Sequence, residues 1–173
     1  VSDSDLAQKD VILVNPPFPL LTAYLIPIHL LEDKPIPAHF RVLAPGIFPV
    51  EIHRSRENTL VVRPTHGYGR PPQWQRKKWN EIHTYVDFIN ASIRFENMLL
   101  KPPTTFEMGH RISLAGVGIQ ITQLTEDNRP AEAVFSFDLP LEDSRYIWRQ
   151  WNMIDWRYEP FPLPRIGETV ICK

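Results

Sequence analysis

The sequence has a single cysteine, Cys172, among its 173 residues, so it cannot form an intrachain disulfide. A metal site built from several thiolates is excluded for the same reason. Because Cys172 ends an apolar segment near the C-terminus, we expect it to be a strand residue rather than a nucleophile.

An excess of charge of either sign is also missing. The formal net charge is −1 at pH 7 and the pI is about 6.7. Proteins that bind nucleic acid or anionic membranes normally carry a basic patch, so this balance gives no reason to expect either partner. Hydrophobic residues make up 43% of the chain, which is ordinary for a globular protein and disfavours disorder.

Long apolar runs are absent as well. The longest, Phe18 to Leu31, is interrupted by prolines and a histidine and is shorter than the ~20 residues that a membrane-spanning helix needs. The sequence starts with Val1 and shows no basic segment followed by an apolar one, so we expect any targeting signal to lie outside it. The missing initiator methionine predicts that the chain is a piece of a longer one.

Proline, in contrast, is abundant. Eighteen prolines are spread along the chain, which is about twice their usual share. Each proline fixes φ and removes a hydrogen-bond donor, so spread prolines end many short elements. This distribution predicts short strands joined by rigid loops.

Apolar patterns predict β-strands over most of the sequence. Asp10 to Asn15 is a nearly continuous apolar run, typical of a strand buried on both faces. Further runs with a strand pattern cover residues 39–44, 49–54, 59–63, 111–114, 117–124, 133–137, 146–151, 156–161 and 167–171. Turn residues at 55–58, 126–130 and 152–155 predict antiparallel hairpins.

Two segments have helical spacing of their apolar residues, 19–33 and 79–95, and Pro27 would kink the first. We therefore predict an α+β fold over residues 1–173, one globular domain with a mostly antiparallel sheet or sandwich and two helices. The order strand, helix, strand over residues 10–44 also permits a right-handed βαβ crossover.

The motifs of common catalytic and nucleotide-binding sites are missing, among them G-x-S-x-G, the P-loop and H-E-x-x-H. The six histidines are at least ten residues apart, so no local metal chelate exists. We expect no catalytic residue, metal or cofactor. The alternative is a hydrolase-like or metal-assisted enzyme whose site assembles from distant residues such as His53, His66 and Asp138. His66 lies in a loop rich in glycine and proline, where functional side chains concentrate.

Aromatic residues and arginines gather between residues 145 and 158. On paired strands, alternate aromatic side chains form a ladder on which arginines stack, and such a face could bind a sugar or a peptide. The other interpretation, which we favour, is that the aromatic residues belong to the core. The candidate binding residues are Trp148, Trp151, Trp156, Arg149, Arg157 and His66. If they form a binding face, at least two of the three tryptophans should be substantially exposed.

Several segments share the layout of a known group of proteins. These segments are Asp10–Pro17, Arg41–Gly46, Thr59–Pro64, Met108–Leu114, Gly116–Ile121, Leu124–Ala133 and Phe135–Asp143. Together they resemble the soluble C-terminal region of uncharacterised bacterial multi-pass membrane proteins. The resemblance implies a place next to a membrane, on its extracytoplasmic side, and carries no activity onto any residue.

The function expected from the sequence is therefore a non-enzymatic, soluble binding or interaction domain of a membrane protein. Its partner would be a protein or a glycan, and its membrane linkage would lie in the missing part of the chain.

Overall fold

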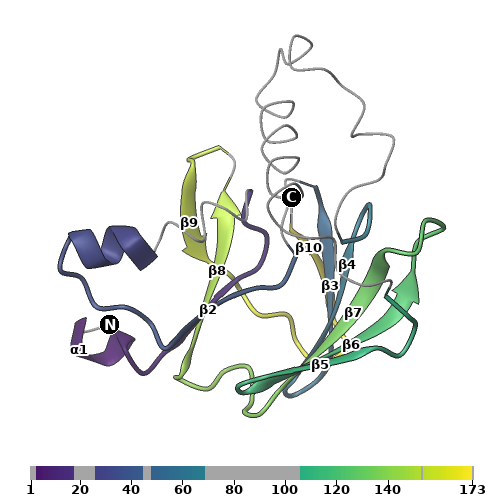
Figure 1. Cartoon of the computed structure of the whole chain (residues 1–173), viewed down its shortest axis with the longest axis horizontal. Helices are drawn as coiled ribbons and strands as arrows, with labels where there is room; N and C mark the ends of the chain where they lie inside the picture. Colours follow the sequence, from purple (N-terminus) through teal and green to yellow (C-terminus); the bar gives the residue numbers. More distant parts are fainter. Residues whose placement is uncertain (1–2, 18–25, 45–47, 69–105, 153, 173) are drawn as a thin grey trace, which may run out of the picture.

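The computed structural model describes residues 3–17, 26–44, 48–68, 106–152 and 154–172. These residues contain a short helix, α1 (Asp3–Leu6), and two sheets that lie beside each other (Figure 1). The strands are β1 (Asp10–Leu13), β2 (His39–Val42), β3 (Val50–Arg56), β4 (Thr59–Pro64), β5 (Arg111–Leu114), β6 (Val117–Leu124), β7 (Pro130–Phe137), β8 (Tyr146–Asn152), β9 (Arg157–Pro160) and β10 (Thr169–Cys172).

The smaller sheet has four strands in the order β2-β1-β8-β9. One of its two central strands, β1, is parallel to both β2 and β8, whereas β8 and β9 form an antiparallel hairpin. Every residue of β1 is buried, because both faces of the strand are covered. Part of the outer face is covered by helical residues 26–31, since the His29 ring contacts the ring of Phe40 on β2 edge-on at 6.3 Å.

The larger sheet has six antiparallel strands in the order β10-β3-β4-β7-β6-β5. Its hairpins follow from local turn chemistry. Gly116 adopts a φ of +77° between β5 and β6, and Asn128 adopts a φ of +59° between β6 and β7, the left-handed conformation that these residue types tolerate best. β10 pairs with β3, so the first and last strands of this sheet in sequence order lie next to each other.

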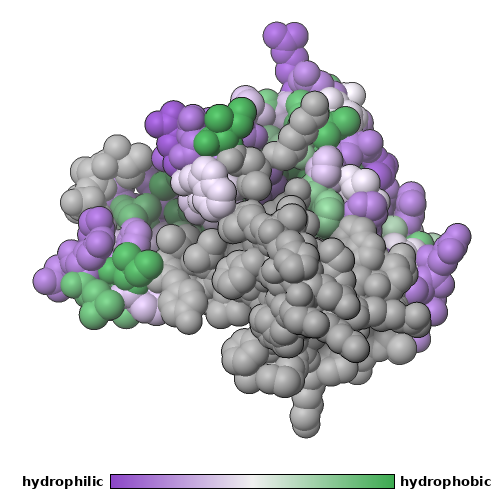
Figure 2. Space-filling model, turned by 90° about the horizontal axis from the view of Figure 1, so that it is seen from above, coloured by the Kyte–Doolittle hydropathy of each residue, from purple (hydrophilic) through white to green (hydrophobic). Residues whose placement is uncertain are grey.

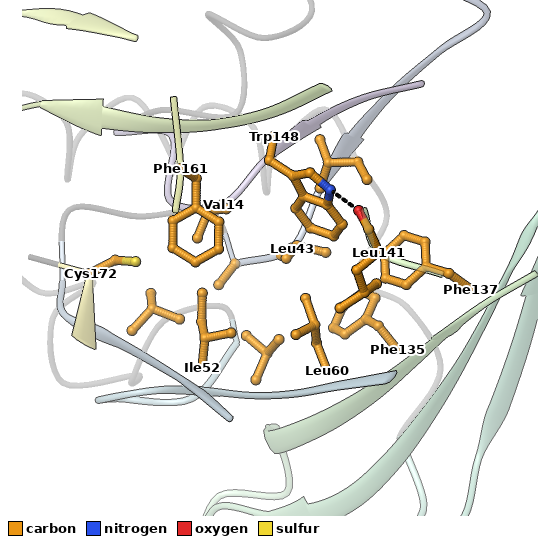
Figure 3. Packing of buried hydrophobic residues seen from close by; sticks show 14 of the residues in the cluster. Val14, Leu43, Ile52, Leu60, Phe135, Phe137, Leu141, Trp148, Phe161 and Cys172 are labelled. Atoms are coloured by element: carbon orange, nitrogen blue, oxygen red, sulfur yellow. Dashed lines mark hydrogen bonds between the residues drawn. The ribbon is translucent and has the colours of Figure 1, made fainter. Parts of the chain in front are cut away.

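One hydrophobic cluster lies between the sheets (Figure 3). Alternation along the strands supplies it, with Ile12 from β1, Ile52 from β3 and Leu60 from β4 all fully buried. Buried Arg54 closes one side, because its guanidinium forms an ion pair with Glu142 and donates to the carbonyl oxygens of Glu57 and Pro164. The guanidinium thereby ties the β3–β4 turn to two loops.

The prediction of a β-rich, mostly antiparallel fold is confirmed. Six of the eight strand pairings among the described residues are antiparallel, and the strand predicted to be buried on both faces is β1. The prediction of two helices is not confirmed. Residues 26–31 of the first segment are helical, but residues 19–25 of that segment and all of the second segment, 79–95, lie outside the described residues. The short helix α1 was not predicted.

Candidate functional site

The β8–β9 hairpin carries most of the candidate binding residues. Asn152 pairs with Arg157 next to the turn, and Trp151 pairs with Tyr158 one step further from it. The side-chain oxygen of Asn152 accepts hydrogen bonds from the backbone N–H groups of Ile154 and Asp155, at 2.9 and 3.1 Å. An asparagine in this position builds the turn from its own side chain. We call residues 152 and 154–157 the hairpin tip.

Trp148 belongs to the core and not to a binding face. Its side chain points from β8 into the inter-sheet cluster (Figure 3), and it is only 8% exposed. It packs edge-on against Phe137 at 5.4 Å, and its indole N–H donates to the carbonyl of Leu141 at 2.8 Å. This placement corrects the proposal that Trp148 contacts a ligand.

Trp151 lies on the opposite face of the same strand. It follows Trp148 by three positions, and successive side chains of a strand alternate between its faces. Trp151 is half-buried and contacts the Tyr158 ring edge-on at 5.0 Å. Its backbone N–H donates to the side chain of buried Asn15 at 2.9 Å. Arg149 shares this face, since it lies two positions before Trp151 on the same strand.

Trp156 and Ile154 are the exposed apolar residues of the hairpin tip. Trp156 is 56% exposed and Ile154 is 89% exposed. Trp156 also has a φ of +52°, which is rare for a bulky residue. Only one of the three tryptophans is therefore substantially exposed, so the extended aromatic ladder is not formed. Arg157, at the end of the tip, is exposed and pairs with Asp155 at 3.2 Å.

His66 lies in a different part of the molecule, after the end of β4. It is exposed and contacts the Phe48 ring edge-on at 5.0 Å. An open pocket of about 590 Å³ lies between the residue 64–67 turn and the β6–β7 turn. In the wall of this pocket, Arg129 donates to the His66 carbonyl at 2.9 Å and forms an ion pair with Asp127. Hydrogen bonds from Arg129 and Thr125 hold the pKa of Asp127 below its ordinary value.

The residues of the alternative enzyme site are not brought together. The backbone of Tyr68, two residues after His66, donates to Pro130 at the start of β7, whereas Asp138 follows the end of β7. The eight-residue strand between them spans roughly 25 Å. His53 lies on β3 and bonds to Thr169 at 3.0 Å. Among the described residues, no group of three or more His, Cys, Asp or Glu side chains is placed to hold a metal ion.

A buried charged cluster was missed by the sequence reasoning. Asp10 is 4% exposed at the start of β1, and it accepts hydrogen bonds from His39 at 2.7 Å and Arg41 at 3.1 Å. Arg41 also donates to the carbonyl of Ala115 in the β5–β6 turn. The cluster therefore joins the two sheets at one end of the core. The sequence feature that could have predicted this cluster is the carboxylate of Asp10 at the start of an otherwise apolar strand.

Comparisons of the chain with protein-family models, with curated proteins and with solved structures found no match. Within the described part of the chain, no helix is both long enough and apolar enough to cross a membrane.

Proposed function

We propose that this protein is a non-enzymatic binding domain that belongs to a membrane protein on its extracytoplasmic side, and that the β8–β9 hairpin tip is its contact surface. The observation that carries the proposal is the exposure of Ile154 and Trp156 on an ordered turn. Exposing two large apolar side chains together is costly in water, and grouped exposures of this kind often mark a contact site.

The base of the hairpin supports this assignment. The Trp151–Tyr158 ring contact lies directly below the tip, and β8 is held in the sheet between β1 and β9. A turn that is anchored in this way is pre-organised, so little conformational entropy is lost when a partner binds. Arg157 adds an exposed cation beside the apolar pair. Arg149 and His66 lie elsewhere, and we give them no role in this surface.

Site-specific photo-crosslinking in the producing cells tests the contact surface. A photoreactive amino acid replaces Ile154 or Trp156, and Leu114, which is 49% exposed on β5, supplies the matched control. We expect discrete adducts, to protein, glycan or lipid, from positions 154 and 156 and none from 114. No adduct at 154 and 156, or the same adducts at all three positions, would refute the contact surface.

The complete coding sequence tests the membrane attachment. Hydrophobic spans outside residues 1–173 of the encoded protein would support it. A coding sequence without any such span or lipid-attachment signal would overturn the attachment and leave the contact surface to be judged by crosslinking.

A further inference from the structure

Among the described residues, the apolar surface of the hairpin tip is small. Figure 2 shows that the described hydrophobic residues on this face of the molecule form separate groups among hydrophilic ones. At the tip, charged Asp155 lies between Ile154 and Trp156 in sequence, and Arg157 follows directly. The two apolar side chains offer a few hundred Å² at most, whereas a stable protein interface needs about 800 Å² on each partner.

The charges of the tip compensate each other. Asp155 and Arg157 form an ion pair at 3.2 Å, although both side chains are substantially exposed. The tip is thus an apolar pair with a locally neutral rim, and it has no basic cluster that would attract an anionic polymer or an anionic headgroup. The long side chain of Arg157 can still reach toward polar headgroups while its stem lies along apolar surface.

We propose that the hairpin tip inserts into the interfacial layer of a lipid bilayer. This inference rests on the proposed function and names the occupant of that same surface. Tryptophan favours the bilayer interface because its ring is apolar and its N–H is polar, and isoleucine favours the acyl chains beneath. A glycan site would account for an exposed indole face but not for an exposed isoleucine, which has no hydrogen-bonding group.

The pre-formed turn explains how so small a surface can insert. The Asn152 side chain satisfies the backbone N–H groups of Ile154 and Asp155 within the protein. Those groups would otherwise have to leave water without partners, which is costly in an apolar medium. The tip therefore presents its side chains without presenting unsatisfied backbone donors at these two positions.

A fluorescent probe at position 154 tests the insertion. The Ile154→Cys variant of the whole chain is labelled with an environment-sensitive dye, and the Leu114→Cys variant is the control. Cys172 is buried, so the native thiol stays unlabelled. With phosphatidylcholine vesicles we expect a blue shift and quenching by spin-labelled lipids at position 154 and neither at 114. Added anionic lipid should change the result little.

Vesicle co-sedimentation of unlabelled protein gives a second measurement. Ile154→Asp and Trp156→Ala should each lower the partition coefficient onto vesicles about tenfold. Burying such an apolar side chain in the bilayer strengthens binding by roughly a factor of ten. Leu114→Asp should leave it unchanged. A probe at 154 that stays in water, or equal responses at 154 and 114, would overturn bilayer insertion. If crosslinking nevertheless gives protein or glycan adducts at the tip, the contact surface stands and only its lipid occupant is refuted.

Discussion

Replacing Trp148 by alanine gives the sharpest test of the core. The indole is 8% exposed and lies among the rings of Phe137, Tyr146 and Phe161, with centroid distances of 5.4, 6.2 and 6.4 Å. Removing a buried tryptophan leaves a large cavity and costs about 3–5 kcal/mol. The buried carbonyl of Leu141 also loses its donor, which adds to the cost. We expect the free energy of unfolding to fall by at least ~3 kcal/mol.

Two further variants separate packing from hydrogen bonding. Trp148→Phe keeps most of the ring contacts but removes the indole N–H, so we expect a loss of about 1–3 kcal/mol. Trp156→Ala removes an exposed ring and should change stability by less than ~1 kcal/mol.

The assay is urea unfolding followed by circular dichroism, because fluorescence changes with the number of tryptophans. A loss below ~1 kcal/mol for Trp148→Ala, or equal losses for Trp148→Ala and Trp156→Ala, would contradict the packing described here.

Three further predictions concern individual side chains. Hydrogen bonding and charge from Arg54 hold the pKa of Glu142 below its ordinary value of 4.5, so the pair stabilises the fold above that pH and less as the pH falls through the lowered pKa. Glu142→Gln should weaken the acid sensitivity of unfolding, and an unchanged pH profile would contradict the pair. Burial raises the pKa of the Cys172 thiol to about 11. Thiol reagents should therefore label Cys172 only when β10 opens, and rapid labelling of native protein would refute this. Trp156→Gly should be about 1 kcal/mol more stable than Trp156→Ala, because only glycine adopts a positive φ without strain. The usual order, with alanine more stable, would show that this position is not strained.

The antiparallel half of the fold was readable from the sequence. Its strands carry alternating apolar residues, as in Val50 and Ile52, and turn residues separate them by only a few positions. The parallel pairing of β1 with β8 was not readable. Trp151 bonds to Asn15 across 136 residues, and no local pattern specifies a partner at that distance.

The hairpin tip was predicted only in part. Trp148 and Trp151 are three residues apart, so the strand period already places them on opposite faces and argues against a single aromatic ladder. Ile154 was treated as a turn residue and left out of the candidate site. An isoleucine where turns prefer polar residues was the available signal. Trp148 is buried and Trp156 is exposed. This difference arises because Trp148 packs against the six-stranded sheet, and the spacing of residues in the sequence does not predict that packing.

The parallel contacts of β1 have a consequence for how the protein is made. β1 is translated before its partner β8, which follows more than a hundred residues later, and its side chains end up buried on both faces. At ordinary translation rates of about 5–20 residues per second, that interval is roughly 7–27 s. Among the described strands, only β2 can pair with β1 meanwhile. The hairpins of the larger sheet close within shorter stretches of chain and can form first. The newly made chain therefore carries β1 without its β8 partner until β8 has been translated, and it is most open to aggregation or chaperone capture during that interval.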